Sequence, residues 1–203
     1  MLASVTNGPD VVDLDRRAVE LSAAIVAQAT RADLGRPTPC GAWTLHELLD
    51  HMITQHYGFA AASSGQGGDP RVWLTVHPDD PIADYDAAAR HVIAAFARPA
   101  TLERSFELPE ISRTAAFPAA QAISFHFVDY VVHGWDVARS LDVSFELSTD
   151  LAEAALVVAR RVPDGENRLA ENAAFRPSVA STPDGTALDQ VLAALGRSPA
   201  WRP

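Results

Sequence analysis

The sequence predicts an all-α fold: a four-helix bundle with a short helical and loop extension at its C-terminal end. Four long segments carry apolar residues at the spacing of amphipathic helices: residues 10–33, the stretch from Thr44 into SSGQGGDP, residues 82–98, and Pro118 to about Leu141. Strands that alternate with helices are missing from the pattern, and neither a GxGxxG nor a phosphate-loop motif occurs. These observations favour helices packed on helices over a parallel sheet.

Length and composition indicate one domain. The chain has 203 residues, and we expect a core over about residues 10–160 and an extension over 161–203. Hydrophobic residues make up 48%, which is enough for a buried core. The net charge is −10 and all 16 basic residues are Arg. This balance argues against nucleic acid or an anionic membrane as a partner, because both reward clustered positive charge.

The cysteine content and the N-terminal segment favour a cytoplasmic location. Cys40 is the only cysteine, so no internal disulfide can form. The beginning, MLASVTNGPDVVDLD, lacks the basic segment and the long apolar run of a signal peptide. No stretch reaches the ~18 apolar residues of a transmembrane helix.

The first two helices have clear apolar faces. The first presents a stripe of Val12, Ala18, Val19, Ser22, Ile25, Val26 and Ala29. Its charged residues fall largely outside this stripe: Asp13, Asp15, Arg16, Arg17 and Glu20. After a loop from Gly35 to Trp43, Thr44 and Glu47 form a capping box that begins the second helix. That helix then buries Leu48, Leu49, Met52 and Phe59.

Two more long helices follow, and the segments around them are shorter or less regular. The third helix has a core face of Tyr85, Ala89, Val92, Ile93 and Phe96. Between Pro99 and Pro109, Leu102, Ser105 and Phe106 hint at extended structure. Pro118 suits the first turn of the fourth helix. A fifth helix is expected over about 149–161, a long loop over 163–184, and a closing helix over 186–195.

The fourth helix carries the most informative feature of the chain. His126, Asp129 and His133 are spaced by three and four residues in the apolar stretch FHFVDYVVHGWDVA. At ~100° per residue, they project within roughly 60° of one another. Two imidazoles and a carboxylate on an apolar helix are unfavourable unless something satisfies them, and a divalent metal ion would do so. His51, on the second helix, is the best candidate for a ligand from elsewhere.

Other readings of these residues stay open. His51 alone could be a histidine at the edge of the core with one hydrogen bond, and Asp129 could be satisfied by Arg90 or Arg139 in a metal-free bundle. Three protein ligands would leave a coordination position for water or substrate, which favours chemistry over a structural site. His126 could be a fourth ligand, a group that orients a ligand, or a proton carrier. We favour the last two and assign it a catalytic role.

Two motifs resemble a known family. PCGAWTLHELLDHM, followed about 70 residues later by HFVDYVVHGWDVARSLD, resembles the DinB-like metal-binding superfamily, in the actinobacterial branch related to mycothiol-dependent maleylpyruvate isomerase; the ending LDQVLAALGRSPAW is also similar. The resemblance implies a bundle whose metal ion, zinc or nickel, is held by His51, Asp129 and His133. Asp129 stands where the isomerase has Glu, so its carboxylate reaches less far.

The resemblance also implies a function. A small thiol such as mycothiol would bind the open metal position as thiolate, because a metal ion lowers the pKa of a thiol. We expect a thiol S-transferase or isomerase-like enzyme acting on a small electrophile. The alternatives are a non-catalytic metal-binding stress or sensing module and a helical dimerisation module. A homodimer is expected because the helix faces are rich in Ala.

Overall fold

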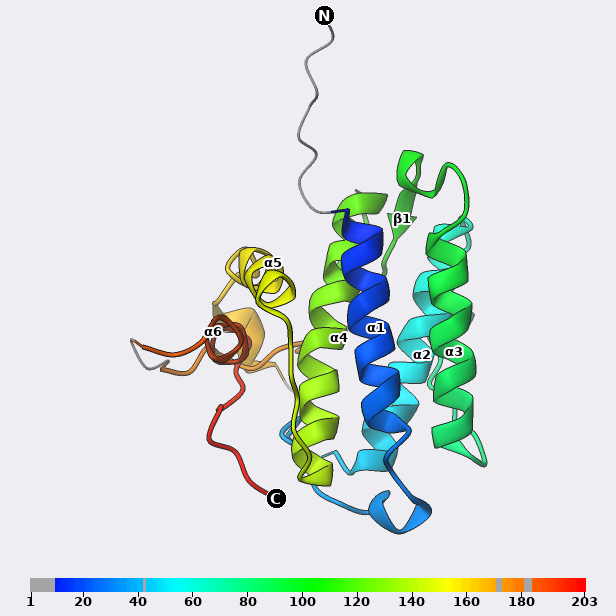
Figure 1. Ribbon diagram of the computed structural model, residues 1–203. Helices are drawn as coiled ribbons and strands as arrows, with labels where there is room; N and C mark the ends of the chain where they lie inside the picture. Colours follow the sequence, from blue (N-terminus) through cyan, green and yellow to red (C-terminus); the bar gives the residue numbers. More distant parts are fainter. Residues whose placement is uncertain (1–9, 42, 171–172, 181–183) are drawn as a thin grey trace, which may run out of the picture.

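The fold is a four-helix bundle with a helical extension packed on one side. The computed structural model describes residues 10–41, 43–170, 173–180 and 184–203. The bundle contains α1 (Val11–Val26), α2 (Leu45–Ser63), α3 (Pro81–Phe96) and α4 (Ala119–Leu141), whose axes run side by side (Figure 1). Of two shorter helices, α5 (Thr149–Ala159) lies next to α4, and α6 (Ala187–Ala194) packs on α5. The all-α bundle predicted from the sequence is confirmed.

Side-chain caps begin most of the helices. The Asp10 carboxylate accepts a hydrogen bond from the backbone of α1, and the Asp80 carboxylate does the same for α3. The predicted capping box of Thr44 and Glu47 is present at the start of α2. Such caps satisfy backbone N–H groups that have no partner inside the helix, typically worth about 1 kcal/mol each. They fix where α1, α2 and α3 begin, and hence the register of the residues on them, whereas α4 begins after Pro118 without a side-chain cap.

The structure differs from the predicted elements in two places. The first helix ends at Val26 rather than near residue 33, and Arg31–Asp33 form a separate 3₁₀ turn. The extended structure suspected near Ser105 is strand β1 (Ser105–Glu107), which pairs antiparallel with β2 (Ala116–Pro118). Pro118 therefore ends β2 immediately before α4, instead of lying in the first turn of the helix.

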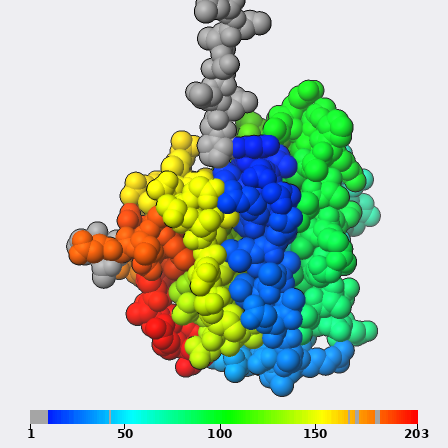
Figure 2. Space-filling model, viewed as in Figure 1, coloured from blue at the N-terminus to red at the C-terminus, as the bar shows by residue number. Residues whose placement is uncertain are grey.

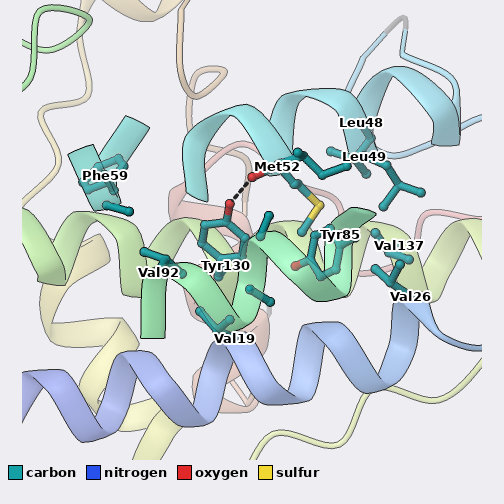
Figure 3. Close-up of a cluster of buried hydrophobic side chains, with 14 of the residues drawn as sticks. Val19, Val26, Leu48, Leu49, Met52, Phe59, Tyr85, Val92, Tyr130 and Val137 are labelled. Carbon is teal, nitrogen blue, oxygen red and sulfur yellow. Dashed lines mark hydrogen bonds between the residues drawn. The ribbon is translucent and has the colours of Figure 1, made fainter. Parts of the chain in front are cut away.

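The core lies between the four bundle helices (Figure 3). Each helix contributes fully buried side chains, and the view labels Val19, Val26, Leu48, Leu49, Met52, Phe59, Tyr85, Val92, Tyr130 and Val137. Burying a large apolar side chain stabilises the fold by about 1.5–3 kcal/mol. The hydroxyl of Tyr130 also donates a hydrogen bond to the carbonyl of Met52, which joins α4 to α2.

Gly134 lets α1 and Phe145 approach α4 closely. A Cβ atom built on this residue would lie 3.2 Å from the Ser22 Cβ and 3.2 Å from the Phe145 ring. Most real Cβ contacts are longer, so a larger residue would push these neighbours away. The close contact lies directly beside His133 in the sequence.

The C-terminal segment packs against the flank of the bundle. Figure 2 shows it in yellow to red beside the blue of α1. Leu151, Val191 and Leu195 share a second apolar cluster with α1 and α4. The buried guanidinium of Arg168 donates to the backbone carbonyls of Val162, Pro163, Arg176 and Ala194, so one side chain organises much of the segment predicted as a loop. None of the helices that the structure describes has the length and apolarity needed to cross a lipid bilayer.

Candidate metal centre

Three of the residues singled out in the sequence come together between α2 and α4. His51, Asp129 and His133 each offer a ligand atom, and these atoms all lie within 4.8 Å of one another. The His133 Nε2 atom is 3.4 Å from the Asp129 Oδ1 atom, as expected for residues four apart on one helix. The ring centroids of His51 and His133 are 5.2 Å apart. Two imidazoles and one carboxylate form a donor set that fits zinc, nickel or a similar ion.

The cluster combines burial with a route for a ligand. The side chain of His133 is 3% exposed, whereas that of Asp129 is 23% exposed. Burial, followed by the positive charge that His133 can carry, lowers the pKa of His51 to about 4. The His51 imidazole is therefore neutral at pH 7, which leaves a nitrogen lone pair for a metal ion.

Asp136 holds His133 from behind. Its Oδ2 atom lies 3.0 Å from the His133 Nδ1 atom, so Nδ1 carries the proton and Nε2 is left as the acceptor facing Asp129. Such a carboxylate–histidine pair is typical of metal ligands, because it fixes the tautomer and the ring orientation. Burial alone would raise the pKa of Asp136, but the charge of Arg197 and the contact with His133 outweigh it and hold that pKa below its ordinary value.

Arg197 reaches this carboxylate from the segment after α6. Its guanidinium donates to Asp136 from Nη2 at 3.0 Å and from Nε at 3.2 Å, and also from Nη2 to the Cys40 sulfur at 3.2 Å. Cys40, His133 and Asp136 are also close enough to share an ion. That position already holds the positive charge of Arg197, and burial raises the pKa of Cys40 to about 12, so its thiol is protonated. The His51 cluster is therefore the better metal site.

An aromatic ring packs on one of the three ligands, and a hydrogen-bonded pair of side chains lies one turn further along α2. The Trp43 ring is 4.8 Å from the His51 ring, centroid to centroid. One turn after His51, Gln55 donates a 3.0 Å hydrogen bond to Glu110 in the loop between β1 and β2. Burial raises the pKa of Glu110, and the negative charge of Asp129 adds to this effect. Glu110 is thus a carboxylate within the electrostatic field of the cluster.

His126 lies apart from the three ligands. Its Nδ1 atom is 2.6 Å from the Asp15 Oδ1 atom, and its Nε2 atom is 3.2 Å from the Nδ1 atom of His56. All three side chains are fully buried, and they come from α1, α4 and α2. The expectation that Asp15 lies outside the core face was wrong, because His126 offers it a partner inside the bundle. Among the residues that the structure describes, the Oδ2 atom of Asp15 and the Nε2 atom of His56 have no hydrogen-bond partner.

The metal-free alternative required an arginine next to Asp129. Instead, Arg90 pairs with Asp86 on α3, and the Arg139 guanidinium lies over the Trp135 ring at 5.7 Å. Within the described part of the chain, no arginine nitrogen lies within 4.0 Å of Asp129; the titratable nitrogen within that distance is Nε2 of His133, at 3.4 Å. That pairing is therefore wrong.

Sequence reasoning missed Glu110, Asp136 and Arg197. A signal existed for Asp136, which follows His133 by three residues in HGWDVA and hence lies on the same side of the helix. Arg197 and Glu110 reach the site from distant segments, and no local pattern marks them.

Comparison with known proteins identifies a family whose model covers most of the bundle. Residues 16–138 match the family described as the mycothiol maleylpyruvate isomerase N-terminal domain. Two relatives from Mycobacterium tuberculosis, the uncharacterized proteins MT0763 (strain CDC 1551 / Oshkosh) and Rv0738 (strain ATCC 25618 / H37Rv), are each 29% identical over 90% of this chain and 95% of their own length.

Solved structures share the fold. The crystal structure of the mycothiol-dependent maleylpyruvate isomerase superposes with a TM-score of 0.51, and that of a histidine-to-alanine mutant of it with 0.52. Both are 12% identical to this chain, cover 73% of it, and are themselves covered over 66% of their length. At this identity the likeness shows the fold alone, a DinB-like bundle. From the family match over most of the bundle, we conclude that the chain belongs to the mycothiol maleylpyruvate isomerase N-terminal domain family.

Proposed function

We propose that this protein is a metal-dependent enzyme that uses a small thiol, mycothiol or a close analogue, in an S-transfer or isomerisation reaction. The observation that carries the proposal is the convergence of His51, Asp129 and His133 on one point between α2 and α4. Membership of a family named after a mycothiol-dependent isomerase supports the thiol. The electrophile would be a small molecule.

The residues fit a divalent ion, zinc first and nickel second. His51, Asp129 and His133 would hold it, with Asp136 fixing the ring of His133. A metal ion bound there would lower the pKa of a thiol or water that coordinates it. Two neutral imidazoles and one carboxylate leave such an ion with a net positive charge, which favours an anionic thiolate as the further ligand.

Other side chains would handle protons. Glu110, whose pKa is raised, can accept the thiol proton near neutral pH better than an ordinary carboxylate can. His126 was assigned a catalytic role from the sequence. Its contacts with Asp15 and His56 support a part in holding a proton within the bundle, not direct contact with the ion.

The test measures metal content and thiol consumption on the same untagged protein. We expect about one tightly held metal per chain, and turnover of mycothiol with a generic electrophile or with maleylpyruvate. His133→Ala should lose both, while His91→Ala, at an exposed position on α3, should keep both. Metal without turnover across several thiols and electrophiles would favour the non-catalytic metal-binding module. Full metal content in His133→Ala would overturn the site. The expected homodimer is checked by sedimentation velocity.

A further inference from the structure

A second group of histidine and carboxylate side chains lies on another face of α2. Asp50 follows His46 by four residues, and its Oδ1 atom is 3.6 Å from the His46 Nε2 atom. His77, between 3₁₀ turn η2 (Pro70–Trp73) and α3, places its Nδ1 atom 2.7 Å from the Asp50 Oδ2 atom. We refer to His46, Asp50 and His77 as the outer cluster.

The chain holds His77 over Asp50 by a specific tether. The Thr54 hydroxyl donates to the Asp50 carbonyl at 2.8 Å and accepts from the backbone N–H of Val76 at 3.0 Å. Since Val76 precedes His77, this pair of hydrogen bonds docks the connecting segment on α2 one turn after Asp50. The approach of His77 to the carboxylate is therefore built into the backbone path.

The Asp50 carboxylate is buried, and one of its oxygens lacks a hydrogen bond among the described residues. The residue is 4% exposed, and the oxygen in question is Oδ1. In the ranges that the structure covers, the two imidazoles are its only ionic partners. A buried carboxylate usually has a permanent cation or several hydrogen bonds, and an imidazole is not a permanent cation. An added positive ion would complete this arrangement.

The outer cluster is separate from the candidate metal centre. Asp50 and His51 are neighbours in sequence, so their side chains point ~100° apart around α2. His51 faces Trp43 and His133, whereas Asp50 faces the segment that carries His77. The two groups share no ligand.

We propose that His46, Asp50 and His77 form a second divalent-metal site, suited to zinc or a similar borderline ion. Two imidazoles and a carboxylate favour such ions over magnesium and calcium, which prefer oxygen ligands. The imidazoles now meet different oxygens of Asp50, and the three ligand atoms do not all lie within 4.8 Å of one another, so the histidines must turn to share an ion. Their side chains are 46% and 75% exposed, which leaves them room to turn onto one ion bound at the carboxylate. The solvent-facing position suits an ion that exchanges with its surroundings, not one enclosed in the fold.

The test is a zinc titration of the full, untagged, metal-stripped chain by isothermal calorimetry, with elemental analysis after dialysis. The wild type should bind two zinc ions per chain, and His77→Ala should bind one. His91→Ala is the matched control, an exposed histidine outside both groups, and should bind two. His133→Ala should retain the ion at the outer cluster. In the double variant His77→Ala/His133→Ala, the zinc affinity of the outer cluster should be at least tenfold lower than in His133→Ala.

The outcomes separate this proposal from the proposed function. Equal stoichiometry in the wild type and His77→Ala, or equal zinc affinity in His133→Ala and the double variant, would overturn the outer site. If His133→Ala binds zinc like the wild type while His77→Ala loses one ion, the outer site stands and the His51 centre falls. His77→Ala also removes the hydrogen bond to the buried Asp50, so the circular dichroism melt of its metal-free form should fall, while its spectrum should remain that of a folded helical protein.

Discussion

Arg197 donates to both carboxylate oxygens of Asp136, a residue 61 positions earlier that contacts the opposite side of His133 from Asp129. Asp136 is fully buried and Arg197 is 3% exposed. The pair links the C-terminal segment to a metal-ligand candidate. Breaking it leaves a buried charge without its partner, which is more harmful than the loss of a surface ion pair.

Arg197→Ala should therefore destabilise the fold by about 3–5 kcal/mol. It should also weaken zinc binding by about 10–100-fold, because the orientation of His133 is lost with the support of Asp136. Urea unfolding and a zinc competition titration measure the two effects. Arg202→Ala, at an exposed arginine in the same segment, is the control and should change neither. Unchanged zinc affinity in a folded Arg197→Ala protein would contradict the role in positioning His133.

His51→Ala should abolish the gain in stability that metal gives. With free zinc at 100 times its Kd, the wild type should gain about 2.7 kcal/mol over the metal-free protein. The variant should gain much less, measured in each protein against its own metal-free form. The metal-free variant should melt somewhat below the metal-free wild type, because the His51 ring packs against Trp43 and His133. Thermal melts with and without chelator show this. The same zinc-dependent shift in both proteins would argue against His51 as a ligand.

The stability should depend on pH through His56. Burial, and then the charge of His126, lowers the pKa of His56 well below 6.5. The unfolded chain therefore takes up a proton below about pH 6.5 that the folded chain does not, so stability falls as the pH decreases, by up to about 1.4 kcal/mol per pH unit. Urea unfolding at pH 7.5 and 5.5 gives the slope.

The matched variant is His56→Phe, which keeps a ring for stacking on Tyr130. It should show a smaller decrease between the two pH values than the wild type, whatever its absolute stability. Asp15 also contributes to the pH dependence of stability, and it does so in both proteins. Burial raises its pKa, so the folded state binds its proton more readily and gains stability as the pH falls, which is opposite to the effect of His56. Identical slopes in the two proteins would contradict the neutral, buried state of His56.

Gly134→Val should destabilise the protein by about 1–3 kcal/mol, because the added atoms meet Ser22 and Phe145. The separation of α1 from α4 should also disturb His133, so zinc affinity should fall. Gly35→Ala provides the control, since a Cβ there has no neighbour within 4 Å. Wild-type stability in Gly134→Val would show that α1 can move away at little cost.

Helical spacing was enough to predict the bundle and the residues that could share an ion. Asp129 and His133 are four apart on one helix, and the capping box at Thr44 fixed where the helix of His51 begins. The same reasoning could not place Asp15, because the face on which a charged residue lies depends on a partner such as His126 from another helix. It also put His126 on the same helix face as Asp129 and His133. Helical spacing does not say which neighbouring helix each turn of that face contacts, and His126 contacts Asp15 and His56 instead. The contact of Arg197 with Asp136 depends on the path of the C-terminal segment.

The position of Arg197 also sets an order of events during synthesis. A ribosome adds about 5–20 residues per second, so Asp136 emerges roughly 3–12 seconds before the arginine that neutralises it. In that interval the nascent bundle already contains His51, Asp129 and His133, but it cannot bury Asp136 without leaving its charge unpaired. The three candidate ligands thus become fully held only when the C-terminal segment has docked, and on the proposed function newly made chains should capture metal late.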